Sequence, residues 1–174
     1  DIAGGSYPAF MNIILGLLLA IRKGTGCYLD ISMYENMIPL AWLGIAHYSY
    51  HNKSPSENSL HLNGGYHRYF IYQTSDKKFI ALGALEDKFW HRFCEIIRAP
   101  NSVVFEKEKP SEIIKKIQII INSKTGSFWK KKFSKETNVC CTLVEKVENL
   151  IKDPHLAEKK ISLKSQLFKK NNIS

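Results

Sequence analysis

The first residues of the chain combine an acid, two glycines and a helix-start signal, a pattern that can support chemistry. Asp1 begins the stretch Asp1-Ile2-Ala3-Gly4-Gly5-Ser6-Tyr7-Pro8. Because the unpaired N–H groups at a helix start favour negative charge, a carboxylate beside them is stabilised. Gly4 and Gly5 lack side chains and let a backbone or a ligand approach closely. The sequence therefore offers a candidate site at Asp1, although a plain N-terminal loop would contain the same residues.

A long apolar helix is predicted directly after this site, over residues 8–23. Ser6 suits a helix cap and Pro8 the first helical position, while the basic residues and the glycine of 22–24 suit its end. Apolar residues lie nearly all round this helix, which is typical of a helix buried on several sides. The apolar run over 9–21 is shorter than the roughly 20 residues that cross a bilayer, so no membrane partner is predicted.

The next residues continue the rhythm of an α/β domain. Residues 27–32 predict a short strand, and residues 34–48 predict a second helix bent at Pro39. Helix, strand and helix in close succession indicate part of an open α/β sheet domain. The polar stretch that follows, over 49–65, is typical of a linker or surface loop.

Beyond the linker, the pattern indicates a smaller unit that mixes strands and helices. Two apolar runs flank a turn at 74–77 and predict a β-hairpin. The predicted elements are strands at 66–73 and 78–83, helices at 85–97, 110–122 and 127–133, a strand at 139–142 and a helix at 143–152. The predicted fold class is α/β, with part of an open α/β large domain (1–48), a linker (49–64), a smaller α+β domain (65–152) and a final segment (153–174) that is a basic tail or the start of a return segment.

Composition narrows the classes of partner. The net charge of +9 comes from lysines spread along the chain. No nucleic-acid reader motif accompanies them, so no nucleic-acid partner is predicted, whereas an anionic ligand such as a nucleotide carrying phosphates suits this charge. The four cysteines form no Cys-x-x-Cys pair, so we expect a reduced compartment. Of the six histidines only His47 and His51 lie at ligand spacing, and no acidic or Cys partner is near them, so no metal site is predicted. The sequence begins with Asp rather than Met, so we expect it to be part of a longer protein.

Several motifs in fixed order make the chain resemble the family III CoA transferases (CaiB/BaiF type), in particular their α-methylacyl-CoA racemase branch. The order and spacing of these motifs hold across about residues 1 to 160. The shared stretches are Asp1-Ile2-Ala3-Gly4-Gly5, 22–26, 29–35, Leu62-Asn63-Gly64-Gly65, 69–76, 79–86 and Phe89-Trp90.

The resemblance implies a large open α/β domain, a smaller domain joined by linkers, and two chains interlocked as rings in a homodimer. It implies acyl-CoA thioesters as substrates, with coenzyme A as part of the substrate and no separate cofactor. A cytoplasmic location, or an organelle matrix in a eukaryote, agrees with this. Roughly half of a family member, its N-terminal portion, is absent from this sequence.

The resemblance also assigns chemistry to particular residues. Epimerising the carbon next to a thioester requires one proton to leave and another to return on the opposite face, while donors stabilise the enolate oxygen. In the racemase-like branch, the acid of the Asp-x-Ala-Gly-Gly motif is one proton carrier and matches Asp1. The second carrier is a histidine upstream of that motif, which this chain lacks. A glutamate that orients this histidine matches Glu86, for which an ordinary first-turn helix acid is the alternative.

The glycines are candidate substrate-binding positions. Gly4 and Gly5 belong to the Asp1 motif, while Gly64 and Gly65 would let the backbone approach a thioester or would form a bare turn. The first hypothesis is therefore a fragment of a racemase-like enzyme, with little activity alone because the partner histidine is missing.

Two other hypotheses stay open. In a CoA transferase, the same aspartate would be a nucleophile that forms an acyl anhydride. Transferase members tend to carry a longer Gly-rich loop than Asn63-Gly64-Gly65-Tyr66, which favours the racemase. A non-catalytic remnant is the third hypothesis. Lys77 stands where the family commonly has Gly, and Asp87 replaces a common Pro after Glu86.

Overall fold

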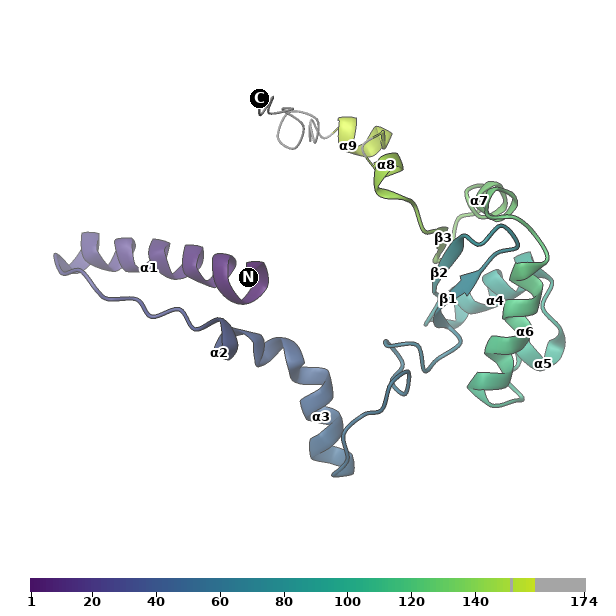
Figure 1. Cartoon of the computed structure of the whole chain (residues 1–174), viewed down its shortest axis with the longest axis horizontal. Coiled ribbons are helices and arrows are strands. Elements are labelled where there is room, and N and C mark those ends of the chain that lie inside the picture. The colour runs from purple at the N-terminus through teal and green to yellow at the C-terminus, as the bar shows by residue number, and fades with distance from the viewer. Residues whose placement is uncertain (151, 159–174) are drawn as a thin grey trace, which may run out of the picture. The chain divides into compact units, whose positions relative to one another are not determined.

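The computed structural model describes residues 1–150 and 152–158, and the chain divides into two compact units. Unit 1 spans Asp1–Ser56 and unit 2 begins at Glu57. Together the described residues form an α/β structure that is mostly helical and contains one small antiparallel sheet (Figure 1). The residues predicted as a basic tail lie largely outside the described part, and the predicted domain limits stay predictions.

Unit 1 begins with a continuous helix whose first turn is wider than the rest. A π-helical turn, η1 (Ile2–Ser6), runs directly into α1 (Tyr7–Lys23), and Gly24 ends the helix with a φ of +71°. The predicted helix at 8–23 is therefore confirmed. The predicted cap at Ser6 is wrong: its backbone is already helical, with a φ of −63°, and its side chain makes no capping hydrogen bond.

Helix α1 exposes its apolar side chains in this structure, contrary to the prediction that it is buried. Pro8 is buried, whereas Phe10, Ile13, Leu17 and Ile21 are among the exposed large side chains. The continuous helix Ile2–Lys23 has 22 residues and is long and apolar enough to cross a membrane, by length and composition only. The prediction that this helix is too short to cross a membrane considered only the apolar run over 9–21, and the observed helix is longer at both ends. Because core helices of soluble proteins meet the same criterion, the absence of a membrane partner stays a prediction.

The segment after α1 is extended but pairs with no strand, so the predicted strand at 27–32 is wrong. Among the described residues, the sheet lies wholly in unit 2, and unit 1 offers no strand to accept these hydrogen bonds. The segment instead packs on α1 (Figure 1). A Cβ atom added to Gly16 would lie 3.1 Å from Sγ of Cys27.

Proline divides the second predicted helix of unit 1. The observed elements are α2 (Met33–Met37), the 3-10 turn η2 (Pro39–Ala41) and α3 (Trp42–His51). Pro39 cannot donate a backbone hydrogen bond and its ring obstructs the preceding turn, so the helix over 34–48 is interrupted rather than only bent. Ser32, which the sequence analysis did not single out, caps α2 by accepting the N–H of Glu35 at 3.3 Å.

Unit 2 is built on a three-stranded antiparallel sheet in the order β1-β2-β3. The strands are β1 (Tyr69–Gln73), β2 (Phe79–Gly83) and β3 (Cys141–Leu143). The predicted hairpin is confirmed, with Tyr72 opposite Ile80, and Ile80 in turn opposite Leu143. Because side chains alternate along a strand, these three residues share the buried face of the sheet.

Helices cover that face and follow the sequence prediction closely (Figure 1). They are α4 (Asp87–Ile97), α5 (Asn101–Val104), α6 (Pro110–Asn122) and α7 (Gly126–Phe133), whereas α8 (Val147–Leu150) and α9 (Pro154–Glu158) follow β3 in the chain. The predictions at 110–122 and 127–133 are confirmed within a residue. Helix α5 was not predicted, because a helix of one short turn is too short to show a repeating spacing of apolar residues. The helix predicted at 143–152 is reduced to α8, since Leu143 belongs to β3 and residue 151 lies outside the described residues.

The core of unit 2 joins both layers through large aromatic and isoleucine side chains. Ring centroids lie 6.0 Å apart between Trp90 and Phe93, and 5.6 Å apart between Trp129 and Phe133. The indole N–H groups are satisfied, with Trp90 donating to the carbonyl of Val104 at 3.1 Å. The fully buried members include Tyr72, Ile80, Trp90, Phe93, Val103, Ile113, Ile117 and Ile121.

The hairpin turn is fixed by one carboxylate. Asp76 accepts hydrogen bonds from the Thr74 hydroxyl at 2.6 Å and from the N–H of Gly126, the first residue of α7, at 2.8 Å. These bonds hold the pKa of Asp76 far below its usual range. Lys77 has a φ of +58°, so the left-handed turn is kept although Lys replaces the Gly that is common in the resembling family.

Two isoleucines on α6 provide a matched test of this core. Ile117 is 0% exposed and Ile119 is 72% exposed. We expect Ile117→Ala to lower the free energy of unfolding by about 2–5 kcal/mol, because it leaves a cavity, and Ile119→Ala by less than about 0.5 kcal/mol. Urea unfolding followed by tryptophan fluorescence measures both. Equal losses would contradict the assignment of the buried face of α6.

Candidate functional site

Asp1 stands at the N-terminal end of the continuous helix of unit 1. Its backbone carbonyl accepts the N–H of Ser6 at 2.8 Å, which closes the π turn, and its side chain is exposed and makes no capping hydrogen bond. The carboxylate is therefore not used to satisfy the helix end. The predicted placement of an acid at the start of the apolar helix is what the structure has.

The two glycines after Asp1 allow a close contact with α2. A Cβ added to Gly4 would lie 2.8 Å from the backbone oxygen of Met33, and one added to Gly5 would lie 3.3 Å from the Met33 side chain. Asn36 also donates to the carbonyl of Gly4 at 3.0 Å. Gly4 is thus required by the approach of a backbone, as the sequence predicts, and substrate binding by either glycine stays a prediction.

Glu86 directly precedes α4 in unit 2. Its backbone carbonyl accepts the N–H groups of Phe89 and Trp90, both at 3.0 Å, whereas its exposed side chain makes no capping hydrogen bond. The ordinary helix-start acid therefore stays the alternative for Glu86, and its role in orienting a histidine stays a prediction.

Gly64 and Gly65 form a compact turn before β1. Gly64 has a φ of +101°, and a Cβ on it would lie 2.8 Å from Oδ1 of Asn58. A Cβ on Gly65 would lie 2.7 Å from the carbonyl carbon of Ser59 and 2.8 Å from the oxygen of Leu60. Both glycines are therefore required by the turn itself, and their role in substrate binding stays a prediction.

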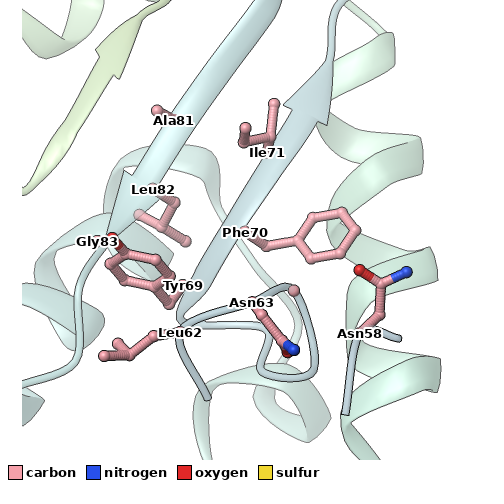
Figure 2. A pocket seen from close by; sticks show the side chains of 10 residues that line it. Asn58, Leu62, Asn63, Tyr69, Phe70, Ile71, Ala81, Leu82 and Gly83 are labelled. Atoms are coloured by element: carbon pink, nitrogen blue, oxygen red, sulfur yellow. The ribbon is translucent and has the colours of Figure 1, made fainter. Parts of the chain in front are cut away.

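This turn forms one wall of an apolar pocket in unit 2 (Figure 2). The other wall is the solvent-facing surface of β1 and β2, and the pocket has a volume of about 500 Å³. Gly64 lines it, and Ile71 on its sheet wall is 58% exposed. Figure 2 shows the side-chain amides of Asn58 and Asn63 on one side of the pocket and the hydroxyl of Tyr69 on the other. The lining residues are Asn58, Leu62, Asn63, Gly64, Tyr69, Phe70, Ile71, Ala81, Leu82 and Gly83.

A charged network built on two buried side chains, those of His67 and Arg68, lies between β1 and the start of α4. Arg68 is 8% exposed, and its Nε donates to Oε1 of Glu106 at 2.5 Å while its Nη1 donates to Oδ1 of Asp87 at 2.7 Å. His67 is 2% exposed and its Nε2 lies 2.8 Å from the same Glu106 oxygen. This network could not be predicted from the sequence, because its members lie far apart in the chain. The one hint of it in the sequence was Asp87, which stands where the family commonly has Pro and which pairs with Arg68 in the structure.

Burial and pairing act in opposite directions on these groups. Burial lowers the pKa of His67, and its hydrogen bond to Glu106 offsets this only in part. For Glu106, burial raises the pKa, but hydrogen bonds from Arg68 and His67 outweigh it, so the pKa falls below its usual value. Neutral His67 donates from Nε2, which leaves its buried Nδ1 without a hydrogen-bond partner.

The predicted site residues divide between the units. Asp1, Gly4 and Gly5 lie together in unit 1, whereas Glu86, Gly64 and Gly65 belong to unit 2. Among the described residues, no group of three His, Cys, Asp or Glu side chains could hold a metal ion.

Comparison with known proteins decides the family. The sequence model of CoA-transferase family III matches residues 1–169. The chain belongs to CoA-transferase family III. This confirms the resemblance drawn from the motifs at Asp1 and Glu86, which lie inside the matched residues.

Curated relatives of this family III chain include enzymes and one unassigned family protein. It is 28% identical to the human alpha-methylacyl-CoA racemase over 165 residues, which cover 91% of the chain and 42% of that protein. It is also 28% identical to a CaiB/BaiF CoA-transferase family protein of Caenorhabditis elegans, covering 81% of the chain and 40% of the relative. The chain therefore spans about two fifths of the length of the curated relatives it matches.

Solved structures agree on the fold. The crystal structure of a D175A mutant of Rv3272 from Mycobacterium tuberculosis superposes with a TM-score of 0.63, covering 86% of this chain and 39% of that one. At 17% identity, this likeness shows the fold alone.

The buried histidine predicts a pH-dependent stability. Because the folded-state pKa of His67 lies below 6.5, the unfolded state binds a proton first as the pH falls. We expect the free energy of unfolding to decrease from about pH 6.5 downward, and His67→Gln to remove this decrease between about pH 6.5 and 5. Urea unfolding at a series of pH values measures the slope.

The exposed His155 on α9 supplies the control. His155→Gln should keep the slope of the unsubstituted chain. Glu106 and Asp76, whose pKa values are lowered, lose their contributions only at more acidic pH. A slope that survives in His67→Gln would contradict the assignment to His67.

Proposed function

We propose that this chain forms part of an enzyme that epimerises the α-carbon of acyl-CoA thioesters by proton transfer. The observation that carries the proposal is the match of 91% of the chain to the human alpha-methylacyl-CoA racemase, together with an unengaged acid at the helix start. Membership of CoA-transferase family III supports CoA thioesters as the substrate class.

Asp1 would carry one of the two protons. The π turn places its carboxylate at the helix end, where unpaired N–H groups favour the charged form, and no capping bond competes for it. Closure of the site over an apolar acyl group would remove water and favour the protonated form. These opposing influences suit a group that both accepts and returns a proton near neutral pH.

The apolar pocket of unit 2 supports an acyl group as ligand. Its wall of strand side chains, with Tyr69, Ile71 and Leu62 partly open to solvent, offers the apolar surface that an acyl chain would bury. The backbone at Gly64 carries no side chain that would keep a thioester at a distance.

The site needs residues from outside this chain. The second proton carrier would be the upstream histidine that the resemblance implies, oriented by Glu86. In the longer protein, two chains would interlock as a homodimer. Asp1→Asn should therefore be studied in a chimera, in which this chain replaces the matching segment of the human racemase.

In this chimera we expect Asp1→Asn to lower the rate of α-proton exchange by about 10²–10⁴-fold, because an amide cannot accept and return the proton. Deuterium incorporation from D₂O into a 2-methylacyl-CoA measures the rate. Asp30→Asn, which changes another exposed acid of unit 1, is the matched control and should leave the rate within about twofold.

Two outcomes would contradict the proposal. Exchange that survives in Asp1→Asn would remove Asp1 from the mechanism. CoA transfer to an added free acid, without α-proton exchange, would instead indicate the transferase, in which Asp1 forms an acyl anhydride. The 174-residue chain alone should give no exchange, since it lacks the second proton carrier.

A further inference from the structure

The side chain of Arg68 hydrogen-bonds to the residues on both sides of Glu86, to the backbone of Leu85 and to the side chain of Asp87. Its Nη1 donates to the carbonyl oxygen of Leu85 at 2.9 Å and to Oδ1 of Asp87 at 2.7 Å. The backbone carbonyl of Arg68 also accepts the N–H of Ala84 at 2.9 Å. One residue therefore fixes three of the four residues from 84 to 87, and the residue it does not contact is Glu86.

Two further contacts hold the Arg68 side chain in place. Its Nε donates to Glu106, and its guanidinium lies 5.3 Å from the centre of the buried Trp90 ring. A guanidinium is planar, so a partner on Nε and a ring on its face fix the direction of Nη1. Because Arg68 is buried, swinging it away would leave charged groups without partners.

Glu86 depends on this support, since its own side chain does not anchor it. The carboxylate is exposed and makes no capping hydrogen bond. Its direction follows from the backbone at Glu86, which is extended with a φ of −76° and a ψ of 142°. Freedom in the turn from 84 to 87 would therefore become freedom of the carboxylate.

We propose that Arg68 is a positioning residue that presents the Glu86 carboxylate toward the upstream histidine by holding Leu85 and Asp87. The inference rests on the proposed function, in which Glu86 orients the second proton carrier. Misplacing a catalytic group by about 1 Å can cost on the order of 100-fold in rate, so loss of this support should be visible in turnover while the fold persists.

The first experiment measures the turn without any reaction. In the full 174-residue chain, amide hydrogen exchange of Phe89 and Trp90 reports the bonds that these N–H groups donate to the carbonyl of Glu86. We expect Arg68→Met to lower their protection by about tenfold or more, the size of a lost charged hydrogen bond. The milder Asp87→Asn, at a largely exposed carboxylate, should lower it less.

Arg92→Met is the matched control. Arg92 lies on α4 and, like Arg68, pairs with two carboxylates, here Glu95 and Glu136, but neither belongs to the turn from 84 to 87. Its substitution should leave the protection of Phe89 and Trp90 unchanged. If Arg68→Met leaves their protection unchanged too, the inference is overturned, whatever the enzyme does.

The second experiment asks whether Arg68 acts through Glu86. In the chimera, Arg68→Met should lower kcat for α-proton exchange by about 10–100-fold, but by less than about twofold when Glu86→Gln is already present. A purely structural role would lower the rate by the same factor in both backgrounds, and that result would overturn the inference.

A proline supplies a rescue that no general loss of stability predicts. Pro favours the first helical position and restricts the residue before it to an extended conformation, which Glu86 already has. Arg68→Met with Asp87→Pro should therefore recover most of kcat, and failure to recover would count against positioning of the turn. If Glu86→Gln alone leaves exchange intact, the role of Glu86 and with it this inference fail, while the protection data still report the contact itself.

Discussion

The ion pair between the buried Arg68 and the half-buried Glu106 is the interaction on which the candidate site of unit 2 depends. A charge taken out of water must be paired and hydrogen-bonded, and removing one partner leaves the other uncompensated. Glu106 accepts from both Arg68 and His67, and its own backbone is left-handed with a φ of +51°. The pair therefore connects the loop before α6 to the residues that enter β1, and through Arg68 to the start of α4.

Local patterns in the sequence predicted local structure well. The hairpin follows from two apolar runs about one turn, and α6 follows from isoleucines that recur at helical spacing after Pro110. The left-handed conformation of Lys77 could not be predicted from its residue type, because such positions usually hold glycine. In such cases the hydrogen bonds around Asp76 outweigh the intrinsic preference of one residue.

Features that depend on distant partners could not be predicted. The strand expected at 27–32 needs a neighbour to receive its hydrogen bonds, and the described residues of unit 1 supply none. Burial of α1 likewise needs covering elements, and its apolar side chains remain exposed. Arg68 reaches Glu106 across 38 residues of sequence, and no spacing rule connects them. Asp1 and Glu86 were predicted to be site residues from the order of the family motifs, since neither acid stands out by itself.

Both proposed acids share one structural property. Each stands at the start of a helix, is exposed and makes no capping hydrogen bond. Gly4 and Arg68 support them in different ways, the first by admitting α2 against the backbone and the second by holding the flanking residues.

A crystal structure of the chimera with a bound 2-methylacyl-CoA tests the central claim most directly. The account predicts that the Asp1 carboxylate lies within about 3–3.5 Å of the α-carbon, the separation of a reacting pair. An Asp1 carboxylate turned to solvent, with the α-carbon out of its reach, would contradict it.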